Sequence, residues 1–126
     1  MAEFAYLTTK GRRTGAPHTI EIWYAEFDGT VYLLSGGGER ADWVGNLKQE
    51  PRVLVRFGGP RERSVDVEGT LPATARMVTD QAEDDLARRL VARKYESWDD
   101  GHPYSDWVRH ALVVAVELDH HGQPAP

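Results

Sequence analysis

Hydrophobic and polar residues alternate along several short segments of the chain, and this pattern predicts β-strands. Residues 4–9 combine aromatic residues with threonines, which favour strands. Residues 19–27 alternate with a period of two, with Ile20, Ile22 and Tyr24 opposite Glu21 and Trp23. Asp28 and Gly29 follow as a strong signal for a two-residue hairpin turn. Further strands are predicted at residues 30–35, 52–57, 63–71, 73–78 and 111–118.

Other segments repeat apolar residues at helical spacing. Residues 40–49 carry two apolar side chains four positions apart, which places both on one helix face. A longer helix is expected from residue 79 or 80 to about residue 98, because Asp80 and Glu83 have the spacing of a capping box. Residues 105–110 predict one more helical turn.

The order of these segments predicts a mainly β fold with helices (α+β). Six or seven strands joined mostly by hairpins favour an antiparallel barrel or half-open barrel with helices packed outside it. The 126 residues suit a single domain over residues 1–126 with one core. The last eight residues, 119–126, have the composition of a disordered tail.

Composition removes several classes of function. The chain has no cysteine, which excludes disulfides, thiolate nucleophiles and cysteine-based metal sites. The histidines lack metal-ligand spacing, so no metal is expected. A net charge of −5 argues against nucleic-acid binding. The longest apolar run, residues 111–116, is too short to span a membrane, and no signal peptide is evident, so a complete cytoplasmic protein without membrane insertion is expected.

Positive charge is concentrated in one turn of this acidic chain. Lys10, Arg12 and Arg13 lie among two glycines, Gly11 and Gly15, and give residues 10–18 a charge of +3 against −8 elsewhere. Guanidinium groups bind phosphate and carboxylate oxygens in bidentate fashion, so the turn predicts a site for a small anionic ligand. The alternative is an exposed turn whose cations only aid solubility.

Two more features could carry chemistry. Three glycines follow the strand ending at Ser35 and precede a helix, where backbone N–H groups could meet an anion or a polar ring edge; the alternative is a flexible turn. The aromatic residues Tyr95, Trp98, Tyr104 and Trp107 could wall an apolar pocket or fill the core. No phosphate-binding P-loop, dinucleotide fingerprint or nucleophile elbow is present.

Residues 6–55 closely resemble the deazaflavin-dependent nitroreductase and quinone reductase family. The matching positions, in order, are Thr8 to Gly15, Tyr24, Ser35 to Gly38, Trp43 to Leu47, and Pro51 to Val55. The rest of the chain matches only in its ending of a helix followed by a strand. The resemblance implies a split β-barrel of the FMN-binding type that uses the deazaflavin coenzyme F420, whose phosphodiester and polyglutamate tail are anionic.

The resemblance also implies roles for individual residues. Cofactor binding falls to Lys10, Gly11, Arg12, Arg13, Thr14, Gly15, His18, Ser35, Gly36, Gly37, Gly38, Trp43 and Asn46. The substrate pocket is expected at Tyr24, Tyr95, Trp98 and Tyr104, and Ser35 or Tyr24 is expected to polarise the acceptor or relay a proton. The expected reaction is hydride transfer from reduced F420 to a quinone, nitroaromatic or other unsaturated small molecule, without a protein nucleophile.

The sequence departs from the family pattern at two places. The chain starts almost at its first strand, where family members commonly carry an additional segment, so a more open site is expected. Gly36 stands where a basic residue often follows the serine. The alternatives left open are an FMN-using oxidoreductase of the same fold, a non-catalytic binder of F420 or a lipophilic ligand, and a small β-barrel interaction module. The protein is expected to be a monomer or a homodimer.

Overall fold

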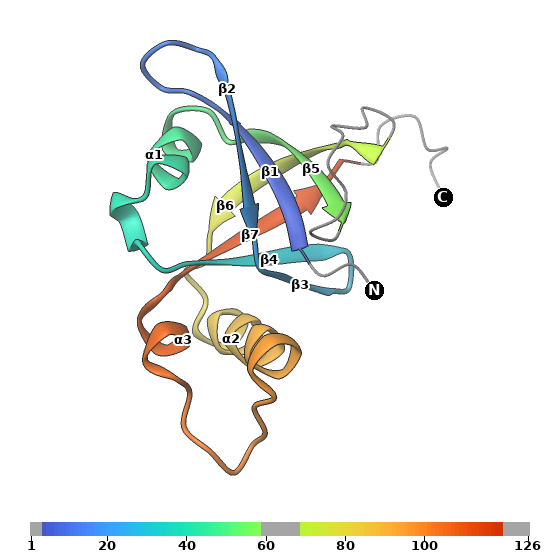
Figure 1. The fold of residues 1–126 in the computed structure, drawn as a ribbon, viewed down its shortest axis with the longest axis vertical. Coiled ribbons are helices and arrows are strands. Elements are labelled where there is room, and N and C mark those ends of the chain that lie inside the picture. Colours follow the sequence, from blue (N-terminus) through green and yellow to red (C-terminus); the bar gives the residue numbers. More distant parts are fainter. Residues whose placement is uncertain (1–3, 59–68, 120–126) are drawn as a thin grey trace.

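The computed structural model describes residues 4–58 and 69–119, in which seven strands form one antiparallel sheet (Figure 1). The strands are β1 (Phe4–Lys10), β2 (Pro17–Ile22), β3 (Tyr24–Phe27), β4 (Thr30–Ser35), β5 (Arg52–Gly58), β6 (Leu71–Met77) and β7 (Leu112–Leu118). Their order in the sheet is β2-β1-β5-β6-β7-β4-β3. Each neighbouring pair is antiparallel, as the predicted hairpins require.

The sheet curls because β2 and β3 are consecutive in the chain but lie at opposite ends of the strand order. Only Trp23 separates them, so the single strand expected over residues 19–27 is interrupted at this residue. The interruption lets one segment pair with β1 on one side and with β4 on the other. The mainly β split-barrel fold predicted from the sequence is therefore confirmed.

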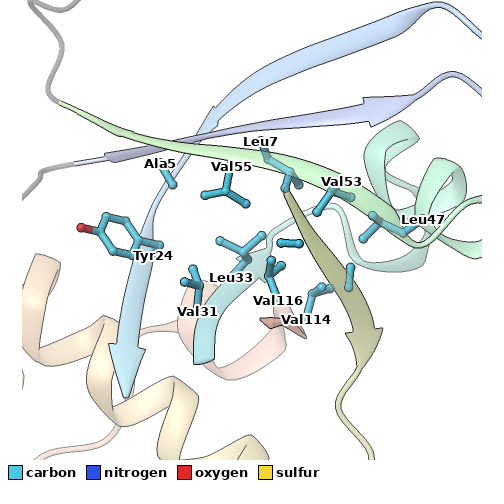
Figure 2. Packing of buried hydrophobic residues seen from close by; sticks show 12 residues of the cluster. Ala5, Leu7, Tyr24, Val31, Leu33, Leu47, Val53, Val55, Val114 and Val116 are labelled. Carbon is cyan, nitrogen blue, oxygen red and sulfur yellow. The ribbon is translucent and has the colours of Figure 1, made fainter. Parts of the chain in front are cut away.

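Two hydrophobic clusters lie on opposite faces of the sheet. The barrel interior holds the inward-facing side chains of β1, β4, β5, β6 and β7, together with Leu47 of the first helix (Figure 2). The second cluster lies between the outer face of β4 and β7 and two helices. Because β4 and β7 are covered on both faces, they read as continuous apolar runs instead of alternating patterns.

The described helices are η1 (Gly38–Arg40), α1 (Asp42–Gln49), α2 (Gln81–Glu96) and α3 (Asp106–His110). Figure 1 shows α1 beside the β1–β2 hairpin, and α2 and α3 together on the other side of the barrel. Asp80 caps α2 by accepting a hydrogen bond from the Glu83 backbone N–H at 2.9 Å. The Glu83 carboxylate instead pairs with Arg76 at 2.7 Å and accepts from the Tyr32 hydroxyl at 2.7 Å.

The remaining boundaries differ from the predictions by a few residues. The helix expected over 40–49 begins at Asp42, because Arg40 ends a separate 3-10 turn. The helix expected to reach residue 98 ends at Glu96, and Ser97 is left-handed with φ of 53°. Residues 63–68 of one predicted strand, and the predicted tail from residue 120, lie outside the described residues. Among the helices of the described residues, none has the length and apolar character needed to cross a membrane.

Candidate functional site

The turn of the β1–β2 hairpin and helix α1 border a hollow of about 410 Å³, here called the hairpin hollow. It is lined by Gly11, Arg12, Arg13, Thr14, His18, Thr19, Ile20, Asp42, Trp43 and Asn46. The turn closes through two backbone hydrogen bonds, from Gly11 N–H to the Ala16 carbonyl at 2.7 Å and from Gly15 N–H to the Gly11 carbonyl at 2.8 Å. Seven of the residues predicted to bind the cofactor therefore line one cavity.

Arg12 joins the turn to α1. Its guanidinium donates to Asn46 Oδ1 at 2.9 Å and to the Asp42 carbonyl at 3.1 Å, and it pairs with the Asp42 carboxylate at 3.3 Å. Its backbone N–H also donates to Asn46 Oδ1, at 3.1 Å. Gly45 makes this contact possible, because a Cβ there would lie 3.1 Å from Arg12 Cζ. Arg12 therefore uses several of its hydrogen-bond donors to fix the hairpin against α1.

Asn46 is the centre of this junction. The residue is 4% exposed, and its side-chain amide also donates to Thr9 Oγ1 at 3.0 Å, where Thr9 is 1% exposed. Buried amides and hydroxyls that are fully paired fix one geometry, whereas leaving one unpaired is costly. The position of the turn relative to α1 is therefore set by a polar network that spans β1 and α1.

The other two cations of the turn occupy different surroundings. Arg13 is exposed, lines the hairpin hollow and has no ion pair or side-chain hydrogen bond with any residue that the structure describes. Lys10 lines a separate hollow on the side of β5, together with Glu50 and Arg52. Hydrogen bonds from Arg52 lower the pKa of Glu50 to about 2, with a smaller contribution from Lys10. The three neighbouring cations in the sequence therefore have three separate environments.

Ser35 and the glycines after it form the turn into η1. Ser35 is 2% exposed, and its hydroxyl donates to the Gly38 carbonyl at 3.1 Å. Gly36 contacts the indole of Trp107 so closely that a Cβ added there would overlap Trp107 Nε1. Gly37 caps η1, and Gly38 has φ of 61°. Ser35, Gly36, Gly37 and Gly38 are absent from the lining of the hairpin hollow, and the space beside Gly36 is taken by Trp107.

A second cavity, of about 380 Å³, lies beside this indole and is here called the tryptophan hollow. Its lining consists of Phe4, Glu21, Ile22, Trp23, Glu96 and Trp107. Trp23 stacks on Tyr95 with ring centroids 4.4 Å apart and nearly parallel planes at 1°, and meets Trp107 edge-on at 5.3 Å. The sequence-based site omitted Trp23. The sequence did contain a signal for it, because Trp23 is a large aromatic residue on the polar side of the alternating segment 19–27.

None of the hollows given by the described residues brings together the four aromatic residues predicted for the substrate pocket. Tyr24 is 6% exposed and lies in the barrel interior (Figure 2). Its ring packs against Phe57, and its backbone N–H donates to Tyr95 Oη at 3.1 Å. Trp98 and Tyr104 form a separate pair, with centroids 4.9 Å apart, in the second hydrophobic cluster. Of the four, Tyr95 stacks on Trp23, which lines the tryptophan hollow.

The surroundings of Tyr24 and Tyr104 keep their hydroxyls protonated. Burial raises the pKa of Tyr24, with a further increase from Glu26. Burial and a hydrogen bond to Asp85 raise the pKa of Tyr104 to about 12. Beside Tyr24, the Lys94 ammonium lies 3.4 Å from the ring centroid and donates to the Tyr24 carbonyl at 3.0 Å, while burial lowers the pKa of Lys94 to about 8.

Strand β2 connects the two hollows. Its residues His18, Thr19 and Ile20 line the hairpin hollow, and the next two, with Trp23, line the tryptophan hollow. Four residues of extended strand span about 13 Å, so the basic end and the aromatic end are separated by about that distance. Within the described residues, no three histidine or carboxylate side chains lie together as a metal site would require.

Solved structures with this fold have diverse descriptions. A candidate 5-nitroimidazole antibiotic resistance protein from Bacteroides thetaiotaomicron superposes with a TM-score of 0.71 at 20% identity, over 94% of this chain and 74% of that one. An F420-H2 dependent reductase gives 0.64 at 22% identity, over 91% and 94%. The heme storage protein from Vibrio cholerae gives 0.69 at 14% identity, over 94% and 82%. At these identities the similarity establishes the split-barrel fold.

The sequence comparison identifies the family, whereas the structural comparison identifies only the fold. The family model for the F420H(2)-dependent quinone reductase matches residues 1–119, which include the hairpin hollow, the tryptophan hollow and every strand described. The resemblance seen in residues 6–55 therefore extends over almost the whole chain. This chain belongs to the F420H(2)-dependent quinone reductase family and is an F420-dependent oxidoreductase.

Proposed function

We propose that the residues of the hairpin hollow would hold the anionic part of F420 and that Gly36 and the residues of the tryptophan hollow would lie beside its deazaflavin ring. The observation that carries this proposal is the succession of a basic and an aromatic cavity along one strand. The residues present fit such a group, because Arg13 offers a guanidinium without a described partner and the turn supplies exposed backbone. Arg12 is assigned a positioning role, since it is bonded to α1.

When bound in its reduced form, the coenzyme supplies a hydride to an electrophilic acceptor. The contribution of the chain is to hold the acceptor against the ring and to keep water away from it. Trp23 and Trp107 are assigned to the acceptor wall, and Ser35 to shaping the turn through its bond to Gly38. Tyr24 contributes through its backbone bond to Tyr95, because its buried hydroxyl has a raised pKa and releases its proton poorly.

A flat unsaturated ring suits this wall best, and we assign the acceptor to quinones or nitroaromatic compounds. The tryptophan hollow, at about 380 Å³, has room for a bicyclic ring. The description of one structural neighbour as a candidate 5-nitroimidazole antibiotic resistance protein supports a nitro-heteroaromatic acceptor. Membership of the quinone reductase family supports a quinone.

The first test is a spectroscopic titration of the purified protein with F420 and, separately, with FMN. We expect selective binding of F420. Replacing Arg13 by Ala should weaken F420 binding about 10-fold to 100-fold, because a hydrogen bond to a charged group contributes about 1.5–3 kcal/mol. The stability of the Arg13→Ala protein should not change. Arg12→Ala should lower both affinity and stability, since it also opens the junction with α1.

Arg93→Ala serves as the matched control, because Arg93 is a partly exposed arginine of α2 that pairs with Asp100 and lines neither hollow. It should bind F420 like the unmodified protein. Turnover with menadione then separates the alternatives. F420 binding without oxidation by menadione would indicate a storage or carrier protein, a preference for FMN would indicate an FMN-using oxidoreductase, and binding of neither would reject the cofactor assignment.

A further inference from the structure

The tryptophan hollow has an unusual combination of walls and charges. Its apolar surface comes from Phe4, Ile22, Trp23 and Trp107, and its charged groups are two carboxylates, Glu21 and Glu96. Among the described residues that line it, none is a lysine or an arginine. The hairpin hollow, further along β2, has the opposite character, with two arginines and one carboxylate in its lining.

Neither carboxylate forms an ion pair with a residue that the structure describes, and the Arg56 guanidinium near Glu21 lies over the Tyr6 ring, 4.3 Å from its centroid. Glu21 accepts a hydrogen bond from the Tyr6 hydroxyl at 3.2 Å, and a neutral donor leaves its negative charge in place. Glu96 has neither an ion pair nor a side-chain hydrogen bond with a described residue. The nearest lysine in sequence, Lys94, directs its ammonium to the Tyr24 ring and carbonyl and lines a different hollow.

Tyr95 and Trp107 hold the indole of Trp23 in place. Tyr95 covers one face of Trp23 at 4.4 Å, and Trp107 meets Trp23 at an interplanar angle of 71°. Indole rings attract cations through their π-electrons, most strongly when water is partly excluded. Two carboxylates beside such a wall add Coulomb attraction for a cation and repulsion for an anion, over distances within the Debye length of about 8 Å at physiological salt.

We infer that Glu21 and Glu96 make the tryptophan hollow select acceptors by charge: it takes cationic and neutral aromatic rings and rejects anionic ones. The two carboxylates are specificity-determining residues in this assignment, which rests on the proposed use of this hollow for the acceptor. A quinone carrying an alkylammonium group, or a nitroaromatic ring carrying a cationic nitrogen, is the preferred class. A sulfonated or carboxylated ring of the same size is disfavoured.

The binding step can be tested without cofactor. The indole N–H signals of Trp23 and Trp107, assigned with Trp→Phe variants, are followed by NMR during titration with three bicyclic rings of different charge: N-methylquinolinium, naphthylmethanol and naphthoate. We expect the cation to bind at least about tenfold more tightly than the anion, with the neutral ring between them. In the Glu21→Gln/Glu96→Gln protein the three affinities should converge to within about twofold.

A protein with two carboxylates removed elsewhere, Glu39→Gln/Glu117→Gln, has the same net charge and is the matched control. Both residues lie outside the tryptophan hollow, in ion pairs with Lys48 and Arg76. This control should keep the full difference between cation and anion. Equal affinity for cation and anion in the unmodified protein, an unchanged difference in the Glu21→Gln/Glu96→Gln protein, or no shift of either indole signal would each overturn the inference.

Turnover provides the second measurement. With reduced F420, the ratio of kcat/KM for naphthoquinone to that for its sulfonate should be large in the unmodified protein and should fall at least about fivefold in the Glu21→Gln/Glu96→Gln protein. If no quinone is reduced, the proposed function fails while the NMR titration still decides the charge selectivity. If naphthoquinone is reduced and the ratio does not change between the two proteins, the selectivity fails and the proposed function stands.

Discussion

The hairpin hollow and the tryptophan hollow are neighbours on one strand, yet they are built from different interactions. The hairpin hollow depends on a buried polar network in which Asn46 joins Arg12 to Thr9. The tryptophan hollow depends on ring stacking, with Trp23 held between Tyr95 and Trp107. Hydrogen-bond networks fix direction, whereas stacked rings supply area and tolerate different partners. In the proposed assignment, the first arrangement holds one specific cofactor and the second admits a range of acceptors.

Adding a methyl group beside Trp107 should produce the largest effect. In the Gly36→Ala protein the new Cβ overlaps Trp107 Nε1, so the indole has to move and the acceptor wall changes shape. We expect kcat/KM for menadione to fall about 100-fold, as misplacement by an ångström can do. Steady-state kinetics measures this loss, and F420 affinity should fall much less. Equal losses in affinity and turnover would mean that the two hollows do not act separately.

Gly37→Ala is the matched control for that change. A Cβ at Gly37 would lie 3.4 Å from the Ala41 Cβ, which is an ordinary contact, and its φ of −81° suits alanine. Activity should therefore stay within about twofold of the unmodified protein. A comparable loss in both proteins would attribute the effect of Gly36→Ala to the stiffness of the turn instead of Trp107.

Removing the Asn46 amide, at the centre of the junction between the turn and α1, should lower stability as well as binding. Asn46→Ala removes the shared partner of Arg12 and the buried Thr9 hydroxyl and leaves Arg12 only its contacts with Asp42, which should reduce the free energy of unfolding by about 2–3 kcal/mol. Urea unfolding measures the loss, and F420 titration should show weaker binding while the tryptophan hollow is unaffected. Gln49→Ala, at an exposed position of α1, should change neither quantity.

Salt should distinguish the two hollows without any mutation. Raising the salt concentration from about 0.05 M to about 0.5 M shortens the Debye length and should weaken F420 binding about tenfold. The KM for a neutral quinone should change less than about twofold, because its contacts in the tryptophan hollow are mostly apolar. Equal salt sensitivity of both constants would place charge–charge contacts in the acceptor site.

A change outside both hollows should alter stability alone, and by the smallest amount. Hydrogen bonds from Arg76 and Tyr32 lower the pKa of Glu83 from 4.5 to about 2. The native state then holds fewer protons on this carboxyl than the unfolded chain does, so its contribution is present above pH 4.5 and is lost as the pH falls to about 2.

Replacing Glu83 by Gln should therefore reduce stability near neutral pH by about 1 kcal/mol, a value reduced for the partial exposure of the pair. Chemical unfolding at several pH values should show a shallower loss below pH 4.5 in the Glu83→Gln protein than in the unmodified one. F420 affinity and menadione turnover should be the same in both proteins. A loss of F420 affinity or of menadione turnover would mean that this ion pair affects the hollows.

Much of the fold followed from local patterns. Alternation, the Asp28–Gly29 turn and the apolar run of β7 predicted a β-rich barrel with external helices, and Asp28 and Gly29 both have the positive φ that such a turn needs, 52° and 83°. The break at Trp23 was missed because the alternation continues through it. The break comes from pairing with two different strands, β1 and β4, and a period of two contains no information on partners.

For the site, the sequence by itself determined that an acidic chain has a cationic, glycine-containing turn and belongs among deazaflavin-using reductases. Only the tertiary structure decided which cations are available. Arg12 and Arg13 are equivalent in sequence, but Asn46, 34 residues away, binds one of them. Likewise Trp107 lies against Gly36 because α3 packs beside the turn after β4. Contacts between residues far apart in the chain depend on how the strands and helices pack, and local sequence patterns do not record that packing.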